Sequence, residues 1–269
     1  MTAPDSRPAA LVLDDVSVVR GGHTVWSDGT LRVAAGAVVG IIGPNGAGKT
    51  TMLQVALGLL PAASGRVEVL GAPPRRGNRR IGYVPQSYTS ALGDAVRCRD
   101  LVTLGLTGTR FGWRRTSAAD RARVDAALEP VGAAGYADRR MSEVSGGQQQ
   151  RVAIAQAIVD DADLLLLDEP LANLDLRNQQ EIVRLLGELH RERDVTIMVV
   201  AHDLNPLLPV LTEAIYLLDG HPHHDPITDV VQEDLLTHLY GTPVGVVRTA
   251  QGDLFTRAAW RDARPGGRE

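Results

Sequence analysis

The chain has almost no lysine, a single cysteine and no long hydrophobic run. Of its 28 basic residues only Lys49 is a lysine, and the others are arginines. Cys98 is the sole cysteine, so no disulfide can form within the chain, which favours a cytoplasmic protein. No segment approaches the roughly 20 apolar residues of a membrane span, and the first ten residues lack the apolar run of a signal peptide. If the protein acts at a membrane, we expect another chain to hold it there.

The remaining composition is ordinary for a globular protein. Hydrophobic residues make up 44% and charged residues 22% of the 269 positions. A chain of this length can bury a large core, either as one domain or as a core with a smaller insertion. The formal net charge of −4 argues against a surface that binds nucleic acid as a whole, although local arginine clusters are compatible with it.

Short apolar runs alternate with helical segments, which indicates an α/β fold built on a parallel sheet. Leu11–Arg20 alternates in polarity and a Gly-Gly pair follows, so we expect an antiparallel hairpin whose second strand lies around Thr24–Trp26. Further strands are predicted at residues 37–42, 66–70, 81–84, 164–167, 195–200 and 214–218, and helices at about 51–60, 117–128 and 178–192.

Between about residues 87 and 158 the sequence is rich in alanine, and no strand is predicted there. We therefore expect a core made of residues 1–86 and 159–225, which includes the hairpin as a small β subdomain. Residues 87–158 are predicted to form an inserted helical subdomain, and residues 226–269 a C-terminal extension that ends in a disordered tail, RPGGRE.

The stretch GPNGAGKTT has the complete spacing of a P-loop, and a predicted buried strand precedes it. Its glycines allow backbone N–H groups to turn inward around a phosphate at the start of a helix. A compact ammonium at Lys49 fits between the phosphates better than a broad guanidinium, and Thr50 can place its hydroxyl on Mg²⁺. We call these residues the phosphate loop, and they are predicted to bind the nucleotide: Gly43, Pro44, Asn45, Gly46, Ala47, Gly48, Lys49, Thr50 and Thr51.

The segment LLLLDEP supplies two adjacent carboxylates at the end of an apolar strand. Asp168 is predicted to face the magnesium shell, and Glu169 to act as the general base that orients the attacking water. Alone, two acids at a strand end would be interpreted as a solvated turn. The phosphate loop upstream favours the catalytic interpretation.

The segment SGGQQQRVAIAQA opens a helix with small residues and exposed N–H groups, which makes it a second phosphate-binding helix end. One chain has no use for two such ends on one γ-phosphate unless the second serves a nucleotide held by a partner. The segment resembles the signature of ABC ATPases, and a P-loop small-molecule kinase would leave it unexplained. The other motifs of that family follow in order: Gln86 after IGYVPQ, Asp175 after LDEP, and His202 after VTIMVV.

The resemblance implies a P-loop NTPase (RecA-like) core that hydrolyses ATP with Mg²⁺ and pairs head to tail with a second copy of itself. It implies that Gln86 contacts Mg²⁺ and the attacking water and links the core to the helical subdomain. It places His202 on the γ-phosphate and Asp175 at the dimer interface. The residues implied to reach the ATP of the opposite copy are Ser145, Gly146, Gly147 and Gln148, and we call them the signature segment.

One departure from the family pattern concerns the adenine. The family usually stacks the base on an aromatic residue near the end of the first strand, and this chain has Arg20 in that place. Arg20 can stack through its guanidinium plane. Trp26, across the predicted hairpin, is the alternative, although a core position is the better expectation for it.

Three softer similarities point to the ATPases of zinc, manganese and iron importers: GLTGTRFGWRR at 105–115, the triple Gln of SGGQQQRV, and LYGTPVGVV at 239–247. They imply a subunit bound to a separate membrane permease at the cytoplasmic face, which works indirectly with a metal-binding extracytoplasmic protein. The alternatives are an ATPase for iron-siderophore or cobalamin uptake, and a soluble ABC protein that acts on nucleic acid or ribosomes. The soluble class commonly carries two nucleotide-binding units or a long coiled-coil insertion, which this sequence lacks, so no nucleic-acid partner is expected.

Two further clusters allow two interpretations each. Phe111 and Trp113, with Arg114 and Arg115, fit a permease-docking surface and ordinary helix packing equally well. The stretch GHPHHDP at 220–226 contains His221, His223 and His224 at a spacing that can bind Zn²⁺. We favour a polar turn stiffened by proline over a metal site in that stretch.

Overall fold

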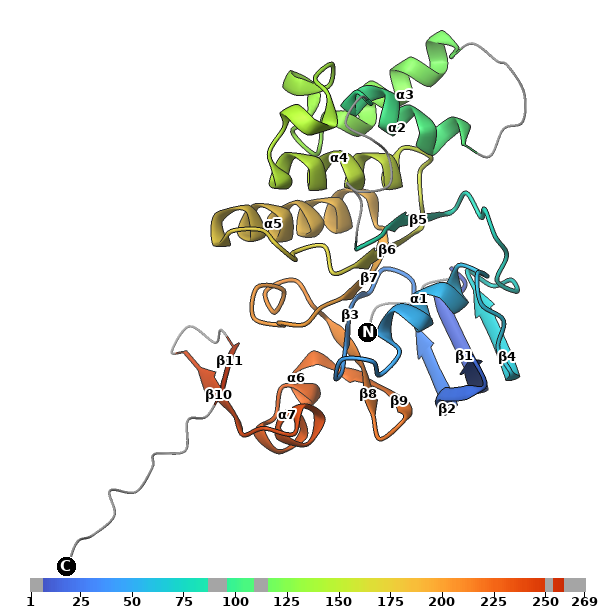
Figure 1. The fold of residues 1–269 in the computed structure, drawn as a ribbon, viewed down its shortest axis with the longest axis vertical. Coiled ribbons are helices and arrows are strands. Elements are labelled where there is room, and N and C mark those ends of the chain that lie inside the picture. Colours follow the sequence, from blue (N-terminus) through green and yellow to red (C-terminus); the bar gives the residue numbers. More distant parts are fainter. Residues whose placement is uncertain (1–6, 87–95, 109–115, 250–253, 259–269) are drawn as a thin grey trace, which may run out of the picture.

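A computed structural model describes residues 7–86, 96–108, 116–249 and 254–258 (Figure 1). At its centre lies a six-stranded sheet with the strand order β5-β6-β7-β3-β8-β9. Five strands are parallel and β9 is antiparallel at one edge. Every residue of β3, β6 and β7 is buried, as expected for a sheet covered on both faces. The strands are β3 (Val38–Ile42), β5 (Ile81–Val84), β6 (Leu164–Asp168), β7 (Thr196–Val200), β8 (Glu213–Leu218) and β9 (His221–Pro226).

A second, antiparallel sheet contains β1 (Leu11–Arg20), β2 (His23–Val33) and β4 (Ser64–Val69) in the order β2-β1-β4. The predicted hairpin is confirmed, with a longer second strand than expected. This sheet and α1 (Lys49–Ala56) cover one face of the central sheet and share a core with it. The helix ends four residues earlier than predicted, because Gly58 adopts a left-handed conformation (φ 66°) just after it.

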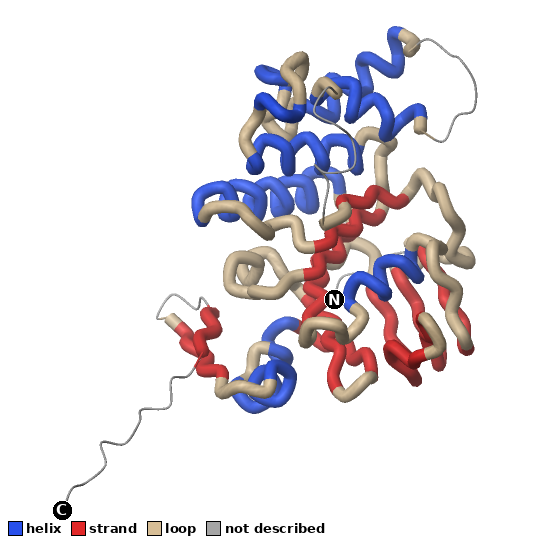
Figure 2. Tube along the Cα trace, in the orientation of Figure 1, coloured by secondary structure: helices blue, strands red, loops and turns tan. Residues whose placement is uncertain are grey.

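The opposite face of the central sheet is covered by helices that gather at one end of the molecule (Figure 2). Next to the strands lie α4 (Gly146–Ile158) and α5 (Leu176–Arg193), and α2 (Cys98–Thr107) and α3 (Ala118–Leu128) pack on α4 farther from the sheet. Short 3₁₀ turns lie at Ala134–Tyr136 and Met141–Glu143. Leu165 and Leu167 of β6 face this side, whereas Leu164 and Leu166 face α1. Among the helices described, none combines the length and the apolar character that crossing a membrane requires.

The polar turn predicted at 220–226 is wrong, since this stretch forms strand β9. Asp219 (φ 51°) and Gly220 (φ 82°) both have positive φ and form the two-residue turn of a β-hairpin between β8 and β9. Asp-Gly is a preferred pair for such a turn, because the turn requires positive φ at both positions and Gly, which has no Cβ, adopts it without a clash. The turn is therefore two residues long, and the histidines beyond it pair with β8.

The C-terminal segment folds onto the core. It contains α6 (Ile227–Val230), α7 (Glu233–Tyr240), β10 (Val244–Arg248) and β11 (Leu254–Ala258), and the two strands form a hairpin. The Asn205 side chain donates to the Thr256 carbonyl (2.8 Å) and accepts from the Thr256 N–H (2.7 Å). These bonds tie β11 to the loop that follows β7. The tail RPGGRE lies outside the described residues.

Candidate functional site

Four of the predicted motifs meet at one edge of the central sheet. The phosphate loop follows β3, Gln86 follows β5, Asp168 ends β6, and His202 follows β7. These four strands are neighbours and run parallel, so their carboxyl ends open onto the same edge. This is where ligands bind in open α/β sheets. The topology thus explains how residues more than 100 positions apart come into contact.

Lys49 lies across the phosphate loop and is only 6% exposed. Its Nζ donates to the carbonyls of Gly43 (2.8 Å) and Pro44 (2.9 Å). Burial lowers the pKa of Lys49, and the nearby carboxylates of Glu169 and Asp168 oppose that shift. The ammonium is therefore held at the phosphate loop by a few directed contacts.

Gly48 shows why the loop requires glycine. Its φ of 100° lies in the left-handed region, and a Cβ there would come within 2.4 Å of Val25 and 2.8 Å of the Trp26 ring. The backbone of the phosphate loop can turn tightly only because no side chain occupies this space.

Thr50 and Asp168 are brought together as predicted for a magnesium site. The Thr50 hydroxyl donates to Oδ1 of Asp168 (3.1 Å), and Asp168 is 3% exposed. Burial raises the pKa of Asp168, while the hydrogen bond from Thr50 counteracts it. A hydroxyl and a buried carboxylate beside a phosphate-binding loop are the hard oxygen ligands that Mg²⁺ prefers. The residues present therefore fit this ion.

Glu169 is the meeting point of the three residues proposed for hydrolysis. Its Oε2 accepts a hydrogen bond from Nε2 of Gln86 (2.6 Å), and its Oε1 lies 2.6 Å from Nε2 of His202. Its φ of 52° is unusual for a residue with a Cβ, and its N–H donates to the carbonyl of Val200 (3.1 Å). Strained backbone of this kind clusters at functional sites and needs support from its surroundings.

The signature segment forms the start of α4. The Ser145 hydroxyl accepts from the N–H of Gln148 (3.3 Å), and the Gln148 side chain accepts from the N–H of Ser145 (2.9 Å). This reciprocal capping box orders the helix end, and Ser145 and Gly146 remain exposed. The helix α4 packs on the face of the central sheet opposite to α1 (Figure 1). The signature segment thus begins a helix on one face of the sheet, and the phosphate loop leads into a helix on the other face.

Asn178 is a residue that the sequence analysis missed. Asp175 caps α5 by accepting from the N–H of Asn178 (2.8 Å) and from its side-chain amide (2.8 Å). Oδ1 of Asn178 occupies the space of a Cβ at Gly147, 2.3 Å from where that atom would lie. Asn178 therefore links Asp175 to the signature segment. The Asp-x-x-Asn spacing at the start of a helix signals the cap on Asp175 but not the contact with Gly147.

The two candidates for the adenine differ in exposure. Arg20 is exposed at the end of β1, beside the Gly-Gly turn. Trp26 is 1% exposed, and its indole lies against Gly48, so its ring faces are in the core as expected. Arg20 remains the candidate for stacking on the base.

Replacing Arg20 with alanine is expected to weaken ATP binding by about 2- to 5-fold, because an exposed cation–π contact contributes about 0.5–1 kcal/mol. Equilibrium binding of a fluorescent ATP analogue measures the change. Arg32→Ala is the matched control, since Arg32 is an exposed arginine of the same sheet. Equal affinities of the Arg20→Ala variant and the unmodified protein would exclude stacking by Arg20.

The three histidines of β9 have separate surroundings. His224 lies 2.8 Å from a carboxylate oxygen of Glu213, His223 stacks on the ring of Tyr216 (centroids 5.0 Å apart), and His221 contacts a backbone carbonyl of β2. Consecutive strand residues point to opposite faces, which separates His223 from His224. His221 and His223 share a face, but each has its own partner, Ser27 for His221 and the Tyr216 ring for His223. In the part of the chain that the structure describes, no three His, Cys, Asp or Glu side chains are grouped to hold a metal ion. The proposed docking residues Phe111, Trp113, Arg114 and Arg115 lie outside the described ranges.

Comparison with known proteins extends these observations. A family model described as ABC transporter matches residues 27–172. The chain is 38% identical to the zinc transport system ATP-binding protein TroB of Treponema pallidum, over 86% of this chain and 87% of that protein. It is 42% identical to the manganese transport system ATP-binding protein MntB of Bacillus subtilis, over 71% and 76% respectively. A solved metal-chelate type ABC transporter in an inward-facing conformation is 25% identical, with a TM-score of 0.81 over 94% of this chain and 97% of the other.

Proposed function

The chain belongs to the ABC transporter family and is an ATPase, and from this premise we propose that it powers the import of a zinc, manganese or iron ion through a separate membrane permease. The observation that carries the proposal is the 38% and 42% identity to ATP-binding proteins of zinc and manganese transport systems. The geometry at the sheet edge supports the same chemistry, since it groups a phosphate loop, two carboxylates, a glutamine and a histidine.

In this proposal the phosphate loop holds the β- and γ-phosphates of ATP, and Lys49 neutralises part of their charge. Thr50, Gln86 and Asp168 would hold Mg²⁺, which supplies positive charge at the transferred phosphoryl group. Glu169 orients the attacking water and accepts its proton, and His202 contacts the γ-phosphate. The contribution of the chain is positioning and charge stabilisation.

The exposure of Ser145 and Gly146 in the signature segment supports a head-to-tail pair of two copies. On the face opposite to α1, the segment would complete the ATP site of a second copy, with Asp175 at the interface. We propose that this pair works at the cytoplasmic face of a membrane. Residues 1–86 and 159–225 would act as the nucleotide-binding core, residues 87–158 as the helical subdomain and residues 226–269 as the C-terminal extension. An extracytoplasmic metal-binding protein would deliver the ion to the permease.

A second candidate is the uptake of a metal chelate, such as an iron-siderophore or a cobalamin. The likeness to a metal-chelate type transporter over 94% of this chain favours it. The identity of 25% is lower than that to the zinc and manganese proteins, so metal-ion import remains the leading proposal.

Reconstitution in proteoliposomes tests the choice. The chain is purified with its membrane permease, and ATP hydrolysis is measured with the extracytoplasmic binding protein loaded with Zn²⁺, Mn²⁺ or Fe²⁺. We expect at least one of these ions to stimulate hydrolysis several-fold over the metal-free binding protein. Stimulation by a ferric siderophore or a cobalamin alone would support the second candidate. Purification with nucleic acid in place of a membrane protein would contradict both.

A further inference from the structure

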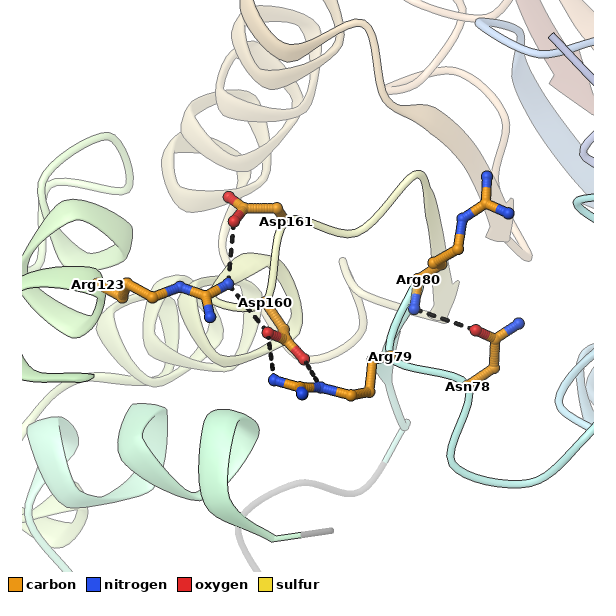
Figure 3. Close-up of polar contacts among 6 residues, drawn as sticks. All are labelled: Asn78, Arg79, Arg80, Arg123, Asp160 and Asp161. Atoms are coloured by element: carbon orange, nitrogen blue, oxygen red, sulfur yellow. Dashed lines mark hydrogen bonds and ion pairs between the residues drawn. The ribbon is translucent and has the colours of Figure 1, made fainter. Parts of the chain in front are cut away.

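A network of charged side chains joins three elements around the end of α4 (Figure 3). Arg79 precedes β5, Arg123 belongs to α3, and Asp160 follows α4. The carboxylate of Asp160 lies between the two guanidinium groups (Figure 3). Arg79 binds both of its oxygens, with Nη2 at 2.8 Å from Oδ1, and Nη2 of Arg123 lies 2.9 Å from the same oxygen. Arg123 also reaches Asp161 (2.9 Å).

Asp160 is more buried than the carboxylate of an ordinary surface ion pair. The Asp160 side chain is only 14% exposed, although Arg79 and Arg123 are partly open to solvent. Isolated exposed pairs contribute little, whereas two-pronged arginine contacts and shared networks fix a relative orientation. Asp160 therefore holds the start of β5 and the helix α3 in a defined position at the end of α4.

Two glycines bring backbones together at the same turn of α4. A Cβ at Gly82 of β5 would lie 2.2 Å from the carbonyl oxygen of Ala157, and a Cβ at Gly105 of α2 would lie 2.5 Å from that of Gln156. The last turn of α4 is thus in direct contact with β5 and α2, next to the ion network. The end of α4 therefore contacts β5 and α2 directly, and α3 through Arg123.

The other end of α4 carries the signature segment. The helix has 13 residues, which corresponds to about 20 Å at 1.5 Å per residue. A change of about 3° in the direction of the helix at Asp160 would displace its start by about 1 Å. The strand β5, which Arg79 precedes, leads to Gln86. The relative position of the signature segment and Gln86 therefore depends on the junction at Asp160.

We propose that Arg79, Arg123 and Asp160 are positioning residues that set the direction of α4 relative to β5. They would place the signature segment for the ATP of the second copy without contacting the nucleotide. The inference rests on the proposed head-to-tail dimer. A misplacement of about 1 Å far from the reacting atoms can cost as much as 10²-fold in rate.

The test compares Asp160→Asn with Asp163→Asn in the full-length chain. Asp163 follows Asp160 closely but pairs with Arg80 (2.5 Å), and both side chains of that pair are about half exposed. For Asp160→Asn we expect kcat for ATP hydrolysis to fall about tenfold or more, with unchanged ATP affinity of the single chain and an unchanged melting temperature. Asp163→Asn should stay within twofold of the unmodified protein, and Asp160→Glu should recover part of the rate.

The dimer is measured separately in the Glu169→Gln background by size-exclusion chromatography with ATP. We expect Asp160→Asn to lower the dimer fraction, and Arg123→Gln, which removes one arm of the network, to lower it less. A kcat within twofold for Asp160→Asn would overturn the inference, because the junction would then have no effect on hydrolysis. A parallel loss of ATP affinity and melting temperature would also overturn it, because that pattern indicates a merely structural role. If the single variant Glu169→Gln formed no dimer with ATP, that result would instead refute the proposed head-to-tail pair.

Discussion

Replacing Glu169 with glutamine is expected to lower kcat for ATP hydrolysis by about 10²- to 10⁴-fold, the usual contribution of a general base. The carboxamide has nearly the same shape as the carboxylate but cannot accept the proton of the attacking water. ATP binding should persist, because the phosphate loop is untouched. Release of inorganic phosphate measures the rate, and equilibrium binding of ATP measures the affinity.

The surroundings of Glu169 explain why this substitution should leave the fold intact. Both carboxylate oxygens have neighbours at 2.6 Å, Gln86 on one side and His202 on the other. A carboxamide keeps an oxygen to accept from Gln86, and its NH₂ group can occupy the position beside the His202 ring. The exchange alters only the end of the side chain, so the positive φ of residue 169 (52° with Glu169) should be kept. Since hydrolysis stops while ATP remains bound, the proposed head-to-tail pair should accumulate with ATP and elute as a dimer.

A neighbouring carboxylate provides the control. Asp203 directly follows His202, and Oδ1 of Asp203 accepts from the N–H of Asn205 (2.9 Å). Asp203→Asn removes a negative charge near the site and keeps that acceptor, so its kcat should stay within about twofold of the unmodified protein. Full turnover by Glu169→Gln would show that Glu169 is not the base. An equal loss in both variants would show that only the local charge matters.

The sequence was sufficient for the parts of the fold that depend on local pattern. The runs around Val38–Ile42, Leu164–Asp168 and Thr196–Val200 are wholly apolar because both faces of the central sheet are covered, and all three strands were predicted. The β9 strand was missed, since its histidines and prolines are typical of a turn. The Asp-Gly pair before it was the stronger signal.

The candidate site likewise contains residues that a sequence pattern reveals and residues whose role depends on packing. The phosphate loop, Asp168 and Glu169 are recognisable because their chemistry demands fixed residues at fixed spacing. The roles of Asn178 and Asp160 could not be read in this way. Asn178 matters because it fills the space beside Gly147, and Asp160 because two arginines from distant segments converge on it. Such contacts arise from packing between elements, which a linear pattern does not encode.

Replacing Lys49 with arginine is expected to lower kcat/KM for ATP by on the order of 10²-fold or more, the range found when a donor to a developing charge is removed. The net charge is unchanged, so an explanation based on charge alone predicts almost no effect. Steady-state hydrolysis gives kcat/KM, and binding of a non-hydrolysable ATP analogue separates affinity from chemistry.

The reason lies in the space around the ammonium. Nζ of Lys49 has two carbonyl acceptors at 2.8 and 2.9 Å, and the residue is 6% exposed. A guanidinium is planar and carries five N–H donors in a rigid fork. Within the tight phosphate loop, several of these donors would be buried without acceptors, at a cost of about 1–3 kcal/mol for each unsatisfied group.

The reverse exchange is the matched control. Arg80→Lys keeps the charge at an exposed position that pairs with Asp163, and the ATPase activity should not change. A chain that uses arginine at every other basic position but keeps lysine here implies a requirement of shape beyond charge. If Lys49→Arg hydrolysed ATP at the unmodified rate, that requirement would not exist, and the single lysine would carry no functional meaning. A large loss in Lys49→Arg beside an unaffected Arg80→Lys would place the requirement at the phosphate loop itself.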